Sequence, residues 1–121
     1  MVSALFDTNI LIDYLNRVPE AGAEFDRFPG KVISIITWVE VMAGVAPDVE
    51  DSTRKFLSQF ALLRLDEDIA EEAASIRRRN RMKLPDAIIW ASARCHGLLL
   101  VTRNEKDFPR NEQGIRMPYR L

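Results

Sequence analysis

Short apolar runs alternate with segments of helical periodicity along the whole chain. Four apolar runs predict buried strands and a shorter fifth run predicts an edge strand, at residues 2–6, 32–35, 62–65, 98–101 and 115–117. Apolar residues at helical spacing predict helices at residues 9–15, 19–28, 37–44, 52–61, 66–79 and 85–95. This alternation predicts an α/β fold, in which a parallel sheet carries helices on both faces.

The composition is that of a folded protein of modest size. Of the 121 residues, 47% are hydrophobic and 29% are charged, which suits one domain with one core. No apolar run approaches the roughly 20 residues that span a bilayer. The N-terminus lacks a signal-peptide pattern, so we expect a cytoplasmic protein. The single cysteine, Cys95, excludes an internal disulfide, and we expect it to be a buried small residue.

The charges are distributed unevenly although the formal net charge is only −1. Residues 1–76 carry 14 acidic and 6 basic side chains, whereas residues 77–121 carry 4 acidic and 11 basic ones. An acidic half next to a basic half favours a cation site beside an anion-binding surface. The other interpretation is that the two halves interdigitate in space and their fields cancel.

Asp7 stands where the first predicted strand turns into a helix. Open α/β sheets bind their ligands at this end of the strands. An Asp directly before a helix is also a common N-cap, worth on the order of 1 kcal/mol, and capping is the stronger interpretation of Asp7 taken alone. In the helix that follows, Ile10, Leu11 and Tyr14 are predicted to face the core and Asp13 the solvent.

Glu40 and Asp86 lie near the starts of two other predicted helices. Thr37 and Glu40 match a capping box, in which the acid returns to the backbone of the cap residue. Asp86 gains from the helix dipole in the first turn after Pro85. It is also an acid on an otherwise apolar helix, where burial is costly unless a cation compensates it.

The loop after the strand 98–101 carries further polar side chains. Thr102 and Asn104 suit a turn held by bonds from side chain to backbone, and Asp107 follows in the same loop. In a parallel sheet, this loop, Asp7 and the starts of the helices all meet at one edge. Acids gathered there repel one another unless a hard cation neutralises them, and ligands that are all oxygens favour Mg²⁺ or Mn²⁺.

Four short motifs resemble those of the PIN-domain ribonucleases. The match is closest to the VapC-type toxins of prokaryotic toxin–antitoxin pairs and to the related FitB-type proteins. The motifs are residues 5–9, 37–40, 85–87 and 102–108, which follow the family's order over essentially the whole chain. The resemblance implies a single Rossmann-like PIN domain over residues 1–121, with a five-stranded parallel sheet. It also implies Mg²⁺- or Mn²⁺-dependent cleavage of RNA, a homodimer, and an antitoxin that binds DNA and blocks the active site.

Carried over by position, the resemblance assigns Asp7, Glu40 and Asp86 to the family's three core acids. Asp7 and Asp86 are expected to hold the principal metal, with Glu40 as a further ligand or as an acceptor for its water. The fourth catalytic position stays open between Asn104, where many members have an acid, and Asp107. The number of metal ions, one or two, stays open with it.

Other residues near these motifs are predicted to support the site or to contact its partners. Arg81 and Lys83 precede Asp86 and suit contacts to RNA phosphates or to an acidic antitoxin tail, although a solvated helix end explains them as well. Side chains that orient the carboxylates or a water are expected at Thr8, Asn9, Thr102 and Asn104.

Two other functions remain open at this point. Structure-specific DNA nucleases use similar acidic clusters on related folds, but this chain looks too short for the extra regions that they carry. The second alternative is a regulatory partner that binds nucleic acid within a complex and has no catalytic role. Loss of the acids abolishes activity in an enzyme and leaves a purely binding role intact.

Overall fold

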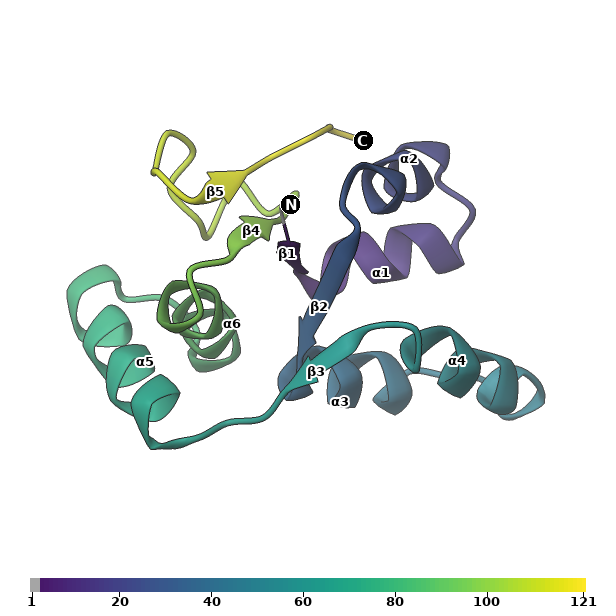
Figure 1. Cartoon of the computed structure of the whole chain (residues 1–121), viewed down its shortest axis with the longest axis horizontal. Helices are drawn as coiled ribbons and strands as arrows, with labels where there is room; N and C mark the ends of the chain where they lie inside the picture. The colour runs from purple at the N-terminus through teal and green to yellow at the C-terminus, as the bar shows by residue number, and fades with distance from the viewer. Residues whose placement is uncertain (1–2) are drawn as a thin grey trace.

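The computed structural model describes residues 3–121, and strands and helices alternate along it (Figure 1). The strands are β1 (Ser3–Phe6), β2 (Gly30–Ser34), β3 (Ala61–Leu63), β4 (Leu99–Val101) and β5 (Ile115–Arg116). The helices are α1 (Thr8–Leu15), α2 (Pro19–Arg27), α3 (Ile35–Ala43), the 3₁₀ turn η1 (Pro47–Val49), α4 (Glu50–Leu57), α5 (Glu67–Asn80) and α6 (Leu84–Cys95). All neighbouring strands pair in parallel, in the order β3-β2-β1-β4-β5. The predicted α/β fold with a five-stranded parallel sheet is therefore confirmed, while Val2, predicted in the first strand, lies outside the described residues.

The central strands of the sheet are buried on both faces because helices cover each face, and successive strand residues point to opposite sides. In the central strand β1, Leu5 packs with the side chains of α5 and α6, whereas Ala4 and Phe6 pack with those of α1 to α4. Val32 and Ile33 of β2 divide in the same way. In Figure 1, α5 and α6 accordingly lie on one side of the sheet and α1 to α4 on the other.

An aromatic cluster fills the layer between the sheet and helices α1 to α4. The ring of Phe6 meets those of Phe25, Phe28 and Phe60 edge-on, at centroid distances of 4.9, 5.9 and 6.3 Å. Such pairs add about 0.5–1.5 kcal/mol each beyond the area they bury. Since Phe6 directly precedes Asp7, this packing fixes the point at which β1 ends.

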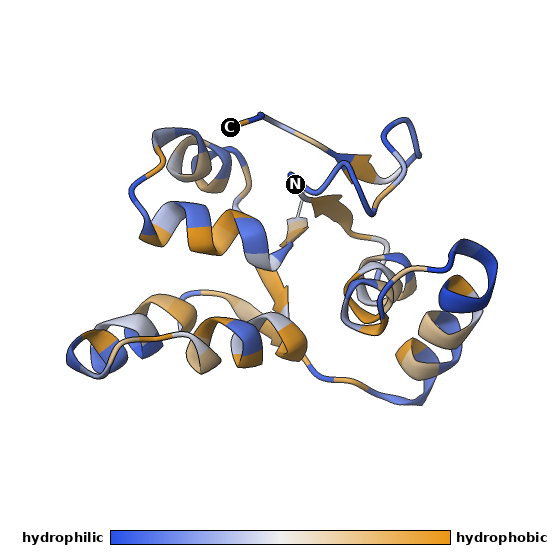
Figure 2. Ribbon diagram, turned by 180° about the vertical axis from the view of Figure 1, so that it is seen from behind, coloured by the Kyte–Doolittle hydropathy of each residue, from blue (hydrophilic) through white to orange (hydrophobic). Residues whose placement is uncertain are grey.

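On the other face, α6 is buried almost all round, as its apolar sequence predicts. All seven residues from Ala87 to Ala93 are buried between the sheet and α5. Figure 2 shows the corresponding colouring, with hydrophobic strands and helices that are banded hydrophobic and hydrophilic. Within residues 3–121, none of the helices has the length and apolar character needed to cross a membrane.

Several predicted boundaries are wrong. Ile35 was predicted to end the second strand, but it opens α3, because the Ser34 hydroxyl accepts a hydrogen bond from the amide of Ile36 at 3.0 Å and so caps the helix. The apolar run continues through this cap, and hydrophobicity alone does not separate a strand from a helix there. Likewise, α4 begins at Glu50 rather than at Ser52.

Two predictions of burial are also wrong. The Tyr14 side chain was predicted to face the core, but Tyr14 is 43% exposed, and its ring stacks on Phe56 of α4 at 5.0 Å. Cys95 was predicted to be buried, but it is exposed at the last residue of α6, where the helix leaves the core. Both residues stand near the end of a helix, where helical periodicity no longer specifies contact with the sheet.

Gly30 provides a test of the β1–β2 register. Ser3 and Gly30 are paired, and a Cβ added at position 30 would lie 2.0 Å from Ser3 Oγ and 2.8 Å from Ser3 Cβ. We therefore expect Gly30→Ala to lower the free energy of unfolding by about 1–3 kcal/mol in urea denaturation. Adding Ser3→Gly is expected to restore part of that loss. Gly44→Ala is the control, since a Cβ there meets nothing within 4 Å, and an equal loss in both variants would contradict the register.

Candidate active site

A cleft of about 320 Å³ lies at the edge of the sheet where β1, β2 and β4 end. Its walls come from the start of α1, from α3, from the start of α6 and from the loop after β4. The lining residues are Asp7, Thr8, Asn9, Ile12, Glu40, Asp86, Arg103 and Asn104. The parallel sheet thus brings three of the predicted acids, from distant parts of the sequence, to one cleft.

Asp7 forms the floor of this cleft and is only 4% exposed. Its Oδ1 accepts a hydrogen bond from the amide of Thr8 at 2.7 Å, as a helix cap does. Its Oδ2 accepts one from the Thr102 hydroxyl at 2.7 Å and a longer one, 3.2 Å, from Asn9 Nδ2. The sequence left two interpretations of Asp7, a helix cap and a site residue. The carboxylate of Asp7 both caps α1 and lines the cleft.

The electrostatics of the cleft disfavour the charged form of Asp7. The pKa of Asp7 is raised to about 6. Burial is the largest cause, the charges of Asp86 and Glu40 add to it, and the hydrogen bonds from Thr102 and Thr8 oppose it. A carboxylate held in this way gains from any cation that enters the cleft.

Asp86 lies in the same field. Its pKa is raised, first by burial and then by the charges of Asp107 and Glu40, and the positive charge of Lys83 opposes this shift. The charge of Asp107 therefore acts on Asp86, although Asp107 is not among the residues that line the cleft. The acids of the cleft act on one another as a group.

The side chain of Glu40 is held by a hydrogen bond from Thr8, which pairs with Thr37, and not by the backbone of a helix cap. The Thr8 hydroxyl donates to Glu40 Oε1 at 2.6 Å, so the 2.9 Å bond between the two threonine hydroxyls is donated by Thr37. The predicted capping box of Thr37 and Glu40 is wrong, because Ser34 is the cap and Thr37 lies buried inside α3. Thr8 thereby orients Glu40.

The loop after β4 holds both candidates for the fourth position in one turn. Asn104 Nδ2 donates to Asp107 Oδ2 at 3.0 Å, and the amide of Asp107 donates to Asn104 Oδ1 at 3.2 Å. The amide of Asn104 also donates to the Thr102 hydroxyl oxygen at 3.0 Å. Asn104 lines the cleft, and Asp107 is hydrogen-bonded to Asn104. Both residues therefore remain candidates for the fourth catalytic position.

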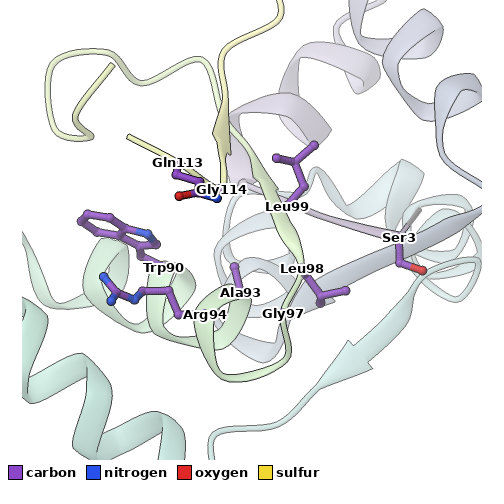
Figure 3. A pocket seen from close by; sticks show the side chains of 9 residues that line it. All are labelled: Ser3, Trp90, Ala93, Arg94, Gly97, Leu98, Leu99, Gln113 and Gly114. Carbon is purple, nitrogen blue, oxygen red and sulfur yellow. The ribbon is translucent and has the colours of Figure 1, made fainter. Parts of the chain in front are cut away.

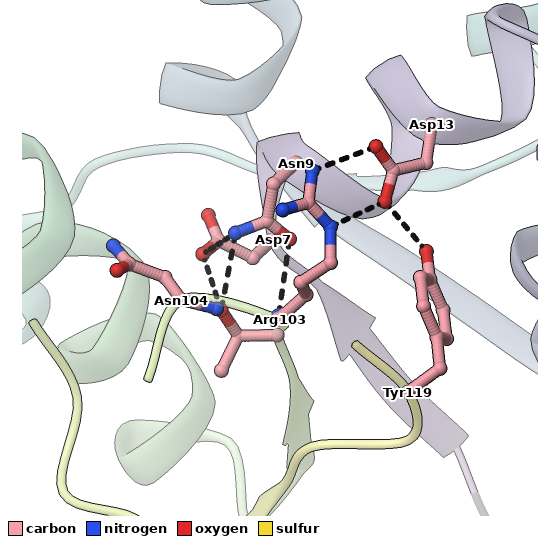
Figure 4. A network of polar contacts seen from close by, with 7 residues as sticks. Asp7, Asn9, Asp13, Arg103, Asn104 and Tyr119 are labelled. Carbon is pink, nitrogen blue, oxygen red and sulfur yellow. Dashed lines mark hydrogen bonds and ion pairs between the residues drawn. The ribbon is translucent and has the colours of Figure 1, made fainter. Parts of the chain in front are cut away.

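A buried ion pair beside the cleft was missed from the sequence. Asp13 was predicted to be a solvated acid, but it is 3% exposed. It accepts hydrogen bonds from Arg103 Nε at 2.6 Å, from Arg103 Nη2 at 2.7 Å and from the Tyr119 hydroxyl at 2.8 Å (Figure 4). The spacing of Asn9 and Asp13, four residues apart, was the available signal, since it places both on the cleft side of α1.

The donor set fits a hard divalent cation by its chemistry. The polar lining of the cleft offers carboxylate and amide oxygens, and its acids repel one another, which a cation relieves. Within residues 3–121, no three His, Cys, Asp or Glu side chains form a ready-made ligand group. Mg²⁺ is commonly held by one or two carboxylates and several waters, so an open arrangement of this kind suits it.

Arg81 and Lys83 are exposed in the short segment that joins α5 to α6. Met82, between them, is 5% exposed and packs in the core formed with α5 and α6. Arg81 adopts a left-handed backbone conformation, with φ of 53°, at the end of α5. Met82 is anchored in the core, and Arg81 and Lys83 lie exposed on either side of it, five and three residues before Asp86.

A larger hollow, of about 740 Å³, lies at the opposite edge of the sheet (Figure 3). It lies where β1 and β4 begin, and its lining contains none of the predicted site residues. The lining residues are Ser3, Trp90, Ala93, Arg94, Gly97, Leu98, Leu99, Gln113 and Gly114. Volume alone therefore does not identify the site, and the acidic cleft is the better candidate because its side chains carry the chemistry.

Comparison with known protein families and solved structures points to one family of proteins. The PIN domain family model matches residues 4–113. A chain of a toxin–antitoxin complex from Klebsiella pneumoniae is 45% identical, with a TM-score of 0.93 over 98% of this chain and 100% of that one. FitAcB from Neisseria gonorrhoeae is 25% identical, with a TM-score of 0.73 over 87% and 90%, and DNA-bound VapBC from Salmonella typhimurium is 26% identical, with a TM-score of 0.78 over 96% of both chains. No curated protein sequence matches the chain.

The raised pKa of Asp7 predicts a specific dependence of stability on pH. The folded protein binds this proton more tightly than the unfolded chain, so the free energy of unfolding falls as the pH rises from about 4 to about 6. Each pKa unit corresponds to about 1.4 kcal/mol. In metal-free buffer we expect wild type to lose on the order of 1–3 kcal/mol relative to Asp7→Asn over this range.

Urea denaturation of both proteins at several pH values measures this difference. Asp48→Asn removes an exposed acid outside the cleft and serves as the control for charge alone. A constant difference between wild type and Asp7→Asn across the range would show that the carboxyl of Asp7 is not perturbed by its burial.

Proposed function

The chain belongs to the PIN-domain family, and on that premise we propose that it is a metal-dependent endoribonuclease, the toxin of a toxin–antitoxin pair. The observation that carries the proposal is the meeting of Asp7, Glu40 and Asp86 in one cleft, where burial, and then the charges of the other two acids, raise the pKa of Asp7. Full-length similarity to a chain of the Klebsiella pneumoniae toxin–antitoxin complex supports the toxin role.

The residues of the cleft have two kinds of role: some would bind a metal ion, and others orient the carboxylates that bind it. Asp7 and Asp86 would hold a divalent cation, with Glu40 beside them. When bound, Mg²⁺ or Mn²⁺ supplies the Lewis acidity that activates water and stabilises the charge developing on a phosphodiester. Thr102 fixes one oxygen of Asp7, and Thr8 fixes Glu40.

Three further side chains complete this assignment. Asn9 donates to Asp7 and so helps to orient it. Asn104 or Asp107 supplies the fourth catalytic position, and their shared turn leaves both able to serve. The acids then exclude anions from the cleft until a cation is present, which makes substrate binding depend on the metal.

The basic side chains before α6 suit the path of the RNA. Lys83 is close enough to Asp86 for its charge to oppose the rise in the pKa of Asp86. A phosphate bound by Arg81 and Lys83 would therefore lie next to the acidic cleft. Such contacts are independent of base identity and add affinity that falls with salt.

An apolar groove of about 410 Å³ adjoins the acidic cleft and suits an antitoxin helix. Ile12 lines both, so one bound segment can cover the groove and reach the acids. Ile12 and Leu15 are each 38% exposed and Val49 is 44% exposed, which is a large exposure for aliphatic side chains. We propose that an antitoxin covers them, and, from the family resemblance, that the toxin forms a homodimer.

A second role is favoured by one structural neighbour. The VapBC complex from Salmonella typhimurium, 26% identical to this chain, was solved bound to DNA. We propose that this protein also takes part in a DNA-bound complex with its antitoxin. Such a role does not require the carboxylate of Asp7, so it is separable from cleavage.

Substitution of the acids tests the enzyme. We expect Asp7→Asn and Asp86→Asn each to lower the cleavage of single-stranded RNA by more than about 10²-fold, since loss of outer partners alone costs 10–100-fold at metal sites. Cleavage is measured by gel electrophoresis with Mg²⁺ or Mn²⁺, with chelator, and on DNA of the same sequence. Asp26→Asn, on the exposed side of α2, is the control. Activity that survives both chelator and substitution would refute the mechanism.

Salt dependence tests the RNA path. We expect Lys83→Gln and Arg81→Gln to lower kcat/KM severalfold, and each to reduce the slope of log(kcat/KM) against log[salt] by about one. The physical reason is the loss of one phosphate contact. Lys55→Gln, an exposed lysine on α4, is the matched control. An unchanged slope in both variants assigns Arg81 and Lys83 to a solvated helix end.

A further inference from the structure

A chain of polar contacts connects the C-terminal segment to the acidic cleft. The Tyr119 hydroxyl donates to Asp13, and Asp13 accepts the two parallel bonds of the Arg103 guanidinium (Figure 4). These residues come from the C-terminal segment, from α1 and from the loop after β4. Tyr119 lies 106 residues from Asp13 in the sequence, so only the fold joins them.

Arg103 lies between Thr102 and Asn104 in the loop after β4, which supplies hydrogen bonds to the surroundings of Asp7. Its neighbour Thr102 donates to the Asp7 carboxylate at 2.7 Å, and the amide of Asn104 donates back to that threonine at 3.0 Å. The amide of Arg103 itself donates to Asn9 Oδ1 at 3.2 Å, while Asn9 Nδ2 donates to Asp7. The backbone of Arg103 therefore belongs to the same hydrogen-bond network as the two side chains that donate to Asp7.

The ion pair is built to fix geometry rather than to add stability. Asp13 is 3% exposed, whereas the Arg103 side chain is 31% exposed, and the cost of burying the carboxylate offsets part of its attraction to the guanidinium. The bidentate contact sets both the position and the plane of the guanidinium. Burial and the bond to Asp13 raise the pKa of Tyr119, so its hydroxyl stays protonated and remains a donor.

We propose that Tyr119, Asp13 and Arg103 are positioning residues that align the loop after β4 with Asp7, so that the C-terminal segment sets the geometry of the acidic cleft. The inference rests on the proposed nuclease function and adds residues to it. Tyr119 lies beyond residues 4–113, the part of the chain that the PIN domain family model matches.

The chain contains a matched control for this proposal. Arg116 Nε and Nη2 donate to Glu24 at 2.7 and 2.9 Å, which is the same bidentate geometry. Glu24 is 5% exposed, and this pair also joins the C-terminal segment to the first half of the chain. Neither side chain bonds to the loop after β4 or to Asp7. A structural role thus predicts equal effects for the two pairs, and a positioning role predicts unequal ones.

The test compares Tyr119→Phe and Asp13→Asn with Glu24→Gln. Tyr119→Phe keeps the ring in the core and removes only the donor, so it addresses the case in which Asp13→Asn does not fold. We expect kcat to fall on the order of 10-fold in Tyr119→Phe and of 10²-fold in Asp13→Asn, with KM for RNA little changed. The control variant, Glu24→Gln, is expected to keep kcat within about twofold at the same fraction folded.

Two further readouts do not depend on RNA cleavage. The dissociation constant for Mn²⁺, measured by electron paramagnetic resonance, is expected to rise on the order of 10-fold in Tyr119→Phe and to stay unchanged in Glu24→Gln. The amide protons of Arg103 and Asn104 are expected to exchange faster in Tyr119→Phe than in wild type. Equal behaviour of Tyr119→Phe and Glu24→Gln in kcat, metal affinity and exchange would overturn the proposal.

Failure of the nuclease proposal gives a different result. If wild type neither binds Mn²⁺ nor cleaves RNA, the proposed function fails. Amide exchange at Arg103 and Asn104 then still decides whether Tyr119 orders the loop, since that readout needs neither metal nor substrate. Unchanged exchange in Tyr119→Phe overturns the positioning role in that case as well.

Discussion

The burial of one carboxylate, that of Asp7, is the constraint on which the rest of the site depends. A carboxylate that is 4% exposed must receive hydrogen bonds or gain a cation. Its donors come from both sides, the Thr8 amide from α1 and the Thr102 hydroxyl from the end of β4. This is possible because β1 lies between β2 and β4 in the sheet. The strand order thus serves the site directly, because Glu40 lies on the helix after β2 and Thr102 directly follows β4, on the two sides of β1.

Much of this architecture was predictable from the sequence because it rests on local periodicity. The apolar runs specify strands buried on both faces, and the parallel arrangement follows from the helices between them. The ends of parallel strands share an edge, which is why Asp7, Glu40 and Asp86 were expected together and do line one cleft. Ser34 shows where periodicity fails, since a single hydroxyl ends a strand within a continuous apolar run.

The remaining parts of the site depend on contacts between distant residues, which no local pattern contains. Asp13 looks like a surface acid because its partner, Arg103, lies 90 residues away. Thr37 has the sequence of a helix cap, yet it is buried and supports Thr8 across the cleft. In each case the prediction used only the neighbours of the side chain in the sequence. The environment of the side chain is instead determined by a distant partner that the assembled fold brings to it.

The uneven distribution of charge now has a physical explanation that combines both interpretations of the sequence. Part of the basic half does interdigitate, because Arg103 and Arg116 each form a bidentate pair with a buried acid from the first half of the chain. Those pairs neutralise acids that stand away from the Asp7 cluster. They leave the mutual repulsion of Asp7, Glu40 and Asp86 in place, with exposed Arg81 and Lys83 nearby. The chain therefore cancels charge at pairs that join distant segments and retains it where a cation and a phosphate are expected to bind.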